Sequence, residues 1–131
     1  MPGLLEGITV LDLGQYISAP YCTRVLADMG ASTIKVEPPS GDVARAMGPF
    51  PGDVPHPEKS GLFLALNANK QGITLDLHTT EGREILLRMV ESTDVVAENY
   101  PHDYLPSLGL DYDTLQNFNP RLILLSITPF G

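Results

Sequence analysis

The chain has 131 residues, of which 43% are hydrophobic, and a formal net charge of −8, so it can build one ordinary core or form part of a larger domain. The chain has only eight Lys and Arg residues compared with sixteen Asp and Glu, and the basic residues form no run. Both features argue against a nucleic-acid partner. No stretch approaches the roughly 20 apolar residues of a membrane span, and the start M-P-G-L-L-E does not resemble a signal peptide. We therefore expect a cytoplasmic protein that does not enter a membrane.

Residues 7–42 predict one strand, helix and strand. The apolar run over residues 8–13 is typical of a strand covered on both faces. Residues 33–37 alternate Ile34 and Val36 with polar side chains and predict a second strand, which ends at Pro38-Pro39. A right-handed crossover then places the two strands side by side in a parallel sheet.

The helix between these strands is expected to begin near Pro20, with Ser18 as its cap, and to end at Gly30. An apolar stripe at helical spacing predicts the face that the helix buries. That stripe consists of Cys22, Val25, Leu26 and Met29, and Cys22 is interpreted as a small buried side chain rather than a nucleophile.

Residues 38–59 hold six of the twelve prolines and show no sustained period, so a long loop at about 38–60 is expected. Loops of this length are usually functional or disordered. Arg45 and Lys59 are candidates to meet an anion there, although solvated loop charges are the simpler interpretation.

The second half of the sequence continues the α/β pattern. Thr80 is the expected cap of the longest helix in this half, which buries Ile85, Leu86, Met89 and Val90, and Asp111 is the expected cap of a later short helix. In chain order we expect a short helix over 60–66, a strand from 73 to 77, the helix from 80, a strand over 95–97, the helix after 111 and a strand over 122–127. The predicted fold class is α/β, a Rossmann-like parallel sheet flanked by helices.

Residues that follow the strands are the candidates for a ligand site, because open parallel sheets bind ligands at their carboxyl ends. Glu98, Asn99 and Tyr100 hold such a position. The turn after the first strand has only one glycine, Gly14, and no G-x-G-x-x-G, which disfavours NAD. The three histidines lack metal-ligand spacing, so no metal site is predicted.

Lys70 leaves two interpretations open. With Asn67 and Asn69 it suits a phosphate as a point charge with amide support, or it forms a polar turn before a strand. Asp12, Asp28 and Asp76 have no partner that the sequence reveals. The residues alone thus indicate an α/β domain with an anionic ligand at its strand ends.

Nearly the whole chain resembles the amino-terminal part of the class III CoA-transferases, the family of formyl-CoA transferase and carnitine CoA-transferase that also includes the alpha-methylacyl-CoA racemases. The matching blocks are L-x-G-I-T-V-L-D-L, A-P-Y-C-T, L-A-D-M-G-A-S-T-I-K-V-E-P-P-S-G-D, N-K-Q-G-I-T-L-D-L, D-V-V-A-E-N-Y, L-G-L-D-Y and N-P-R-L-I-L-L-S-I-T-P-F-G.

The resemblance implies a large domain that binds coenzyme A or acyl-CoA as substrate, with no permanently bound cofactor, in subunits that interlock as a dimer. It places the contacts with coenzyme A after the first strand, on the third strand and after the fourth strand. Carried over residue by residue, these contacts are Ile17, Ser18, Leu75, Asp76, Leu77, His78, Asn99, Tyr100 and Pro101.

Two departures from the family pattern concern positive charge. Formyl-CoA transferases have arginines where this chain has Pro38 and Ser107, which leaves two alternatives: weak affinity for coenzyme A, or replacement of these arginines at the phosphates by Arg45, Lys59 or Lys70. In addition, the motif E-N-F-x-P-G becomes E-N-Y-P-H-D, which removes a flexible glycine.

The resemblance places no catalytic residue on this chain. The nucleophilic aspartate of the transferases, and the His and Asp pair of the racemases, lie beyond the final F-G. We therefore expect the coenzyme A-binding amino-terminal portion of a transferase, inactive alone, that forms a homo-oligomer or joins a complementary carboxyl-terminal chain. The alternatives are a portion of an alpha-methylacyl-CoA racemase and a non-catalytic assembly module.

Overall fold

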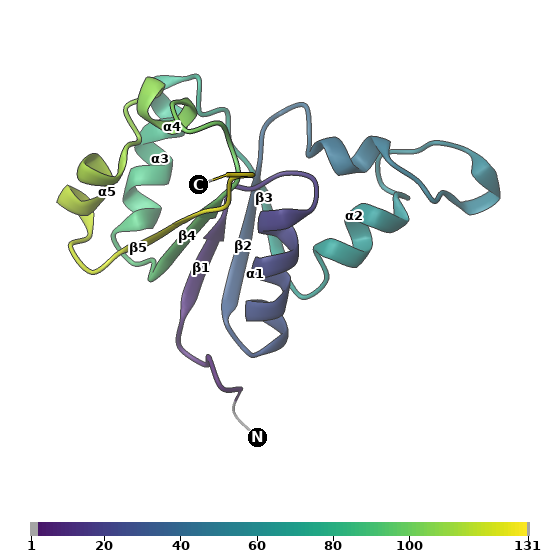
Figure 1. Ribbon diagram of the computed structural model, residues 1–131, viewed down its shortest axis with the longest axis horizontal. Coiled ribbons are helices and arrows are strands. Elements are labelled where there is room, and N and C mark those ends of the chain that lie inside the picture. The colour runs from purple at the N-terminus through teal and green to yellow at the C-terminus, as the bar shows by residue number, and fades with distance from the viewer. Residues whose placement is uncertain (1–2, 131) are drawn as a thin grey trace.

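A five-stranded parallel sheet organises the protein in a computed structural model that describes residues 3–130, so Met1, Pro2 and Gly131 lie outside the described residues (Figure 1). The strand order is β3-β2-β1-β4-β5. The chain adds β2 and β3 on one side of β1 and then β4 and β5 on its other side. The loops after β1 and β4 therefore leave the sheet in opposite directions, and the crevice between them is where such sheets bind ligands. The strands are β1 (Thr9–Asp12), β2 (Ser32–Glu37), β3 (Gln71–Thr74), β4 (Val95–Glu98) and β5 (Ile123–Ser126). The predicted α/β fold class is confirmed.

The helices pack in two groups, α1 against α2 and α3 against α5 (Figure 1). No helix within residues 3–130 has the length and apolar character needed to cross a membrane. The helices are α1 (Ser18–Asp28), α2 (Gly61–Leu66), α3 (Thr80–Val90), α4 (Tyr104–Ser107) and α5 (Tyr112–Phe118).

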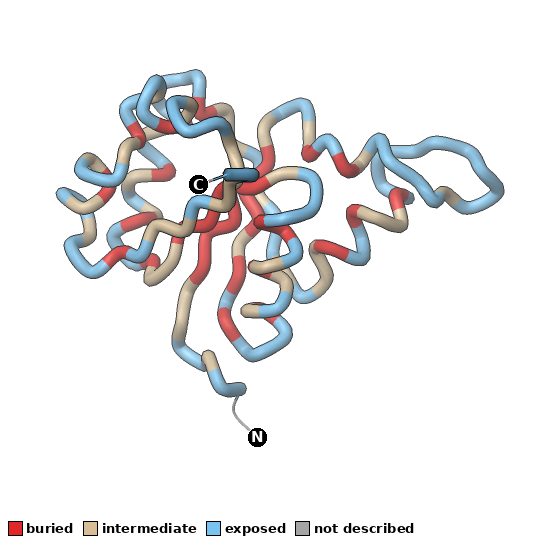
Figure 2. Tube along the Cα trace, in the orientation of Figure 1, coloured by how far each residue is buried: buried red, intermediate tan, exposed pale blue. Residues whose placement is uncertain are grey.

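The two faces of the sheet have different chemistry. On one face, Leu11 and Val36 belong to an apolar core with residues of α3, α4 and α5 such as Leu86 and Leu115. On the other face, the alternate residues of the same strands include charged side chains that are still buried, such as Asp12 at 0% exposure and Lys35 at 2%. Figure 2 shows the buried residues concentrated along the central strands. Successive side chains of a strand point to opposite faces of the sheet. Here one face packs in the apolar core, and the other carries buried polar groups rather than solvent-exposed ones.

The apolar stripe predicted to face the sheet from α1 is confirmed only in part, because Cys22 and Leu26 are half-buried while Val25 and Met29 are exposed. Ala19, Thr23 and Ala27 are buried, whereas Val25 and Met29 are 38% and 39% exposed. Small residues at this spacing let the helix backbone approach β1 closely, and the Thr23 hydroxyl donates to Asp12 at 2.8 Å. The outer face of α1 is consequently apolar and exposed.

The N-caps predicted for α1 and α3 are each one residue out of place. Ile17 holds the N-cap position of α1 without a side-chain hydrogen bond, and Ser18 is its first helical residue. Thr79, not Thr80, caps α3 by accepting from the Gly82 N–H at 3.0 Å. The prediction for Asp111 is confirmed, since its carboxylate accepts from the Thr114 N–H at 2.9 Å.

Strand β3 is shorter and begins earlier than the alternation over 73–77 predicts. It pairs with β2 alone, and β2 ends at Glu37 because Pro38 cannot donate to the ladder. A last backbone hydrogen bond joins the Leu75 N–H to the Glu37 carbonyl at 3.0 Å. Leu75, Asp76, Leu77 and His78 therefore lie after the strand and not on it.

The predicted long loop is present and projects from the body of the protein (Figure 1). It contains two short 3-10 turns, Val43–Ala46 and Pro51–Asp53, and all residues from 51 to 59 are exposed (Figure 2). We call residues 47–59 the arm. In the stretch before residue 111, for which no element is predicted, α4 forms a single helical turn that includes Pro106.

Candidate functional site

Asn99 joins the two loops that meet at the switch between β1 and β4. Its Nδ2 donates to the Gln15 carbonyl at 2.7 Å and to the Ser18 hydroxyl at 2.9 Å. Its Oδ1 accepts from the Gln15 N–H at 2.8 Å. Two of the sequence-predicted residues, Ser18 and Asn99, thus lie in direct contact at the carboxyl edge of the sheet.

Tyr100 extends this edge toward β3. Its hydroxyl accepts from the Gln15 side-chain amide at 3.0 Å, and its ring stacks on Tyr104 with 4.3 Å between ring centres. Burial raises the pKa of Tyr100 to about 12, so the hydroxyl keeps its proton at neutral pH. The backbone N–H of Tyr100 donates to the Glu98 carboxylate at 2.7 Å. This hydrogen bond holds the turn that follows β4.

Residues 75–78 lie against the same aromatic pair. They line a recess of about 20 Å³ together with Tyr100 and Tyr104, and His78 Nε2 lies 3.4 Å from the Tyr104 hydroxyl. The recess has room for little more than one water molecule. A ligand at this edge would lie across the recess rather than inside it.

Ile17 and Pro101 lie at the margins of this arrangement. Ile17 is 43% exposed at the start of α1. Pro101 lines a separate recess of about 150 Å³ between α4 and β5. The structure therefore brings together Ser18, Asn99 and Tyr100, and places residues 75–78 beside Tyr100, while Ile17 and Pro101 border the group.

A buried ion pair accounts for Lys70, for which the sequence left two interpretations. Its ammonium lies 2.8 Å from the Asp12 carboxylate and also donates to the Pro20 carbonyl and the Asn67 side chain, at 2.8 and 2.9 Å. Burial lowers the pKa of Lys70, although the charge of Asp12 opposes the shift. The ammonium is fully used by these partners, so Lys70 does not offer a charge to a phosphate.

A second buried pair holds the loop that carries Ser18. Lys35 lies 2.7 Å from Asp42 and also donates to the Gly14 carbonyl. The other oxygen of Asp42 accepts from the Tyr16 N–H at 2.9 Å, where Tyr16 has a φ of 65°. Sequence reasoning missed this network, because Asp12, Lys35, Asp42 and Lys70 come from four separate segments. The one available signal was a charged residue inside each of the first two strands, Asp12 in β1 and Lys35 in β2.

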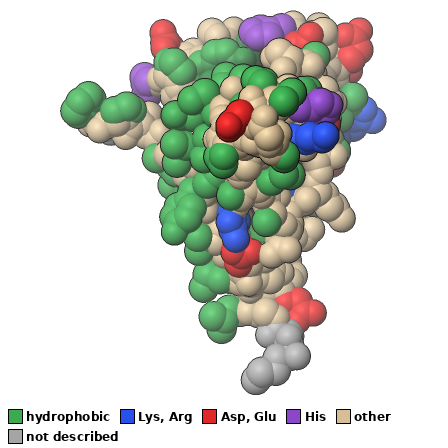
Figure 3. Space-filling model, turned by 90° about the vertical axis from the view of Figure 1, so that its right-hand side faces the viewer, with side chains coloured by type: hydrophobic (Ala, Val, Ile, Leu, Met, Phe, Trp, Pro, Cys, Tyr) green, Lys and Arg blue, Asp and Glu red, His purple; other side chains and the backbone are tan. Residues whose placement is uncertain are grey.

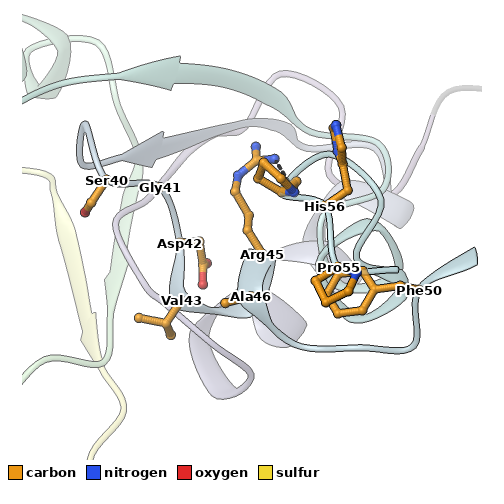
Figure 4. Close-up of a pocket in the computed structure, with 10 residues that line it drawn as sticks. Ser40, Gly41, Asp42, Val43, Arg45, Ala46, Phe50, Pro55 and His56 are labelled. Carbon is orange, nitrogen blue, oxygen red and sulfur yellow. Dashed lines mark hydrogen bonds between the residues drawn. The ribbon is translucent and has the colours of Figure 1, made fainter. Parts of the chain in front are cut away.

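Arg45 is also engaged within the protein. Two of its nitrogens donate to the Glu37 carboxylate at 2.7 and 2.8 Å, and its guanidinium lies 3.7 Å from the centre of the Phe63 ring. The side chain borders a cavity of about 430 Å³ between residues 40–46 and the arm (Figure 4). None of the nine predicted site residues lines this cavity, and its one cation is neutralised, so we do not assign the site to it.

The pair of Glu37 and Arg45 predicts a pH dependence of stability. Burial alone would raise the pKa of Glu37, but hydrogen bonds from Arg45 and from the Asp42 N–H bring it below the ordinary value of 4.5. The unfolded chain therefore takes up more protons in acid, and the stabilisation present above pH 4.5 is lost as pH falls through the lowered pKa.

We expect Glu37→Gln to flatten the decline in the free energy of unfolding below pH 4.5, measured by urea unfolding across a pH series. Replacing the exposed Glu91 by Gln serves as the control and should leave the decline as in the wild type. An unchanged decline in Glu37→Gln would contradict the assignment.

These features define a parallel α/β domain with a ligand edge where the strand order reverses. The chain belongs to CoA-transferase family III, whose family model matches residues 5–131. Among curated relatives, it is 44% identical to the succinyl-CoA:mesaconate CoA-transferase of Haloarcula hispanica, over 98% of this chain and 33% of the relative. It is 40% identical to the formyl-CoA:oxalate CoA-transferase of Afipia carboxidovorans, over 100% of this chain and 30% of that protein.

A solved structure shares the fold closely. The chain superposes on a CAIB/BAIF family protein from Brucella suis with a TM-score of 0.90 and 40% identity, covering 100% of this chain and 35% of that one. The chain thus spans about a third of the length of the relatives that it matches. The predicted membership of the family is confirmed.

Proposed function

We propose that this chain supplies the coenzyme A-binding surface of a class III CoA-transferase, an enzyme that moves CoA between an acyl-CoA and a carboxylate. Coenzyme A or its thioester is the substrate, and no cofactor is permanently bound. The proposed contacts are Ile17, Ser18, Leu75, Asp76, Leu77, His78, Asn99, Tyr100 and Pro101.

The observation that carries this proposal is the convergence of three separate segments on one edge of the sheet. Asn99 links the loop after β1 to the segment after β4, and Tyr100 borders the recess that residues 75–78 line. The edge offers polar groups at Ser18 and Asn99 and apolar surface at the half-buried Leu75, a combination that suits a nucleotide with phosphates. The curated relatives carry the name of CoA-transferases, which supports the same ligand.

We further propose that the isolated chain binds coenzyme A weakly and transfers nothing. In the family the nucleophilic carboxylate lies outside the segments that match this chain, which span about a third of the relatives. On this proposal, residues 1–131 form one Rossmann-like domain or part of one, acting in the cytoplasm.

Association with another chain is the second part of the proposal, and the exposed apolar surface supports it. Tyr21, Val25 and Met29 leave the outer face of α1 apolar, and Ile123 on the edge strand β5 is 60% exposed. Figure 3 shows hydrophobic side chains gathered along one side of the molecule. We propose that a second copy of the chain or a complementary carboxyl-terminal chain covers this surface.

Isothermal titration of the 131-residue chain with coenzyme A tests the proposal. We expect weak saturable binding that His78→Ala reduces severalfold, because His78 borders the recess at the proposed site. His56→Ala is the matched control, since His56 is an exposed histidine on the arm, away from this edge. Absence of coenzyme A binding by the wild-type chain would refute the proposed ligand, and acyl transfer by the purified chain would refute the proposed inactivity.

A further inference from the structure

The eight cations of the chain divide into two groups by their partners. In the part of the chain that the structure describes, four of them lie within salt-bridge distance of a carboxylate, namely Arg24, Lys35, Arg45 and Lys70. Arg45 and Lys70, two of the residues expected to neutralise phosphates, are in this paired group. The cations without a carboxylate partner among residues 3–130 are Lys59, Arg83, Arg88 and Arg121.

Of this second group, Arg83 is the one that contacts the proposed coenzyme A site. One terminal nitrogen of its guanidinium, Nη1, donates to the Leu77 carbonyl at 3.1 Å and to the His78 carbonyl at 3.0 Å. Lys59 lies at the base of the arm, and Arg88 lines a surface hollow with Phe118 on the far part of α3.

The two carbonyl contacts hold the guanidinium in place without neutralising it. The second terminal nitrogen, Nη2, makes only a long contact of 3.5 Å with the Thr80 hydroxyl, and within residues 3–130 Nε makes no hydrogen bond. Nε and Nη2 form the edge of an arginine that binds phosphate oxygens in a bidentate manner. Arg83 is half-buried, so this edge remains reachable.

We propose that Arg83 binds a phosphate at the adenosine end of coenzyme A, and thereby supplies charge that Pro38 and Ser107 cannot. This inference rests on the proposed function, because it assumes coenzyme A at the edge formed by residues 75–78. Leu75 is half-buried and provides the proposed apolar contact for adenine, and the hydrogen bonds from Arg83 to the carbonyls of Leu77 and His78 hold its charge two to three residues further along the same segment. In a chain of net charge −8, an uncompensated cation at this point also offsets the repulsion that an anionic ligand meets.

A purely structural role for Arg83 makes a different prediction. If the side chain only ties the turn at Leu77 and His78, its loss would lower stability and would affect ligands with and without phosphates alike. If it binds a phosphate, its loss weakens the binding of coenzyme A and adenosine 3′,5′-bisphosphate but not that of adenosine, which keeps the base and the ribose and lacks the phosphates.

The test compares Arg83→Gln with Arg88→Gln, a matched control on the same helix outside the site. Titration with coenzyme A and with adenosine 3′,5′-bisphosphate is expected to show about tenfold weaker binding for Arg83→Gln, the scale of a lost charge-assisted contact, and no change for Arg88→Gln. Arg83→Lys should recover part of the loss, because it keeps the charge but not the bidentate edge. Circular dichroism confirms that each variant is folded.

The outcomes separate the two proposals. A wild-type chain that binds coenzyme A, together with an Arg83→Gln variant that binds it equally well, overturns the role of Arg83 and leaves the proposed function standing. Loss of adenosine binding in Arg83→Gln, in proportion to that of coenzyme A, also overturns it in favour of a structural role. A wild-type chain that does not bind coenzyme A overturns the proposed function, and the role of Arg83 with it.

Discussion

Asp12→Ala is expected to lower the free energy of unfolding by about 3–5 kcal/mol, the scale on which breaking one side of a buried ion pair acts. Asp12 is 0% exposed and faces the Lys70 ammonium at 2.8 Å and the Lys35 ammonium at 3.8 Å. Its two oxygens also accept from the Thr23 hydroxyl and the Gly14 N–H, at 2.8 and 2.9 Å. The substitution leaves the ammonium of Lys70 buried with no carboxylate and the Gly14 N–H without its acceptor, and the Thr23 hydroxyl keeps only the Ala19 and Pro20 carbonyls at 3.0 and 3.2 Å.

The pair of Arg24 and Asp28 on α1 provides the control for this prediction. Its side chains are 35% and 42% exposed and 3.3 Å apart, so Asp28→Ala should change stability by less than about 1 kcal/mol. Urea unfolding of both variants measures the difference. Equal losses in Asp12→Ala and Asp28→Ala would mean that water reaches the Asp12 pair and that the buried network contributes little.

Local patterns in the sequence suffice for much of the sheet. The apolar run over residues 8–13, and the change from helical to strand spacing after each predicted helix, can be read from neighbouring residues in the chain. Strands β1, β2, β4 and β5 accordingly match their predicted ranges to within a residue or two. The prediction for Asp111 holds for the same reason, since a cap depends on residues three positions apart.

Apart from the two caps that are displaced by one residue, the wrong predictions concern contacts between distant segments. Strand β3 ends early because its partner β2 ends at Glu37, before Pro38, and the alternation of Ile73 and Leu75 does not reveal where the partner ends. The burial of α1 through Thr23 rather than Val25 depends on Asp12, which lies on another element. A hydrophobic stripe predicts burial only where the opposing surface is also apolar, and this face of the sheet is charged.

The candidate site follows the same division. The family resemblance identified residues 75–78, Asn99 and Tyr100, and the structure gathers them near one edge. Sequence reasoning did not identify how charge is distributed there, because it could not tell that Arg45 and Lys70 are paired within the protein while Arg83 has no carboxylate partner within residues 3–130. Sequence spacing reveals which cations are present, and only the fold reveals which of them are still available to a ligand.

Gly82→Ala is expected to destabilise the protein by about 1–3 kcal/mol, as overpacking of a tight contact does. Gly82 lies in the first turn of α3, and a Cβ there would come within 2.0 Å of the Asp76 carbonyl oxygen and 2.7 Å of its carbonyl carbon. Backbone atoms cannot rotate away as a side chain can, so the helix or the Asp76 segment must move. Helix propensity alone predicts the opposite sign, a gain of roughly 1 kcal/mol for alanine over glycine.

The same substitution is expected to weaken coenzyme A binding, because the displaced backbone belongs to residues 75–78 of the proposed site. Gly72→Ala is the matched control, since Gly72 lies at the edge of the sheet on β3, where an added Cβ would have no atom within 4 Å and the backbone has no positive φ. Thermal unfolding and coenzyme A titration of both variants separate the two effects. A Gly82→Ala variant as stable as the wild type would show that α3 can move away from Asp76 at little cost. Unaltered coenzyme A binding in that variant would show that the site does not depend on the close approach of α3 to Asp76.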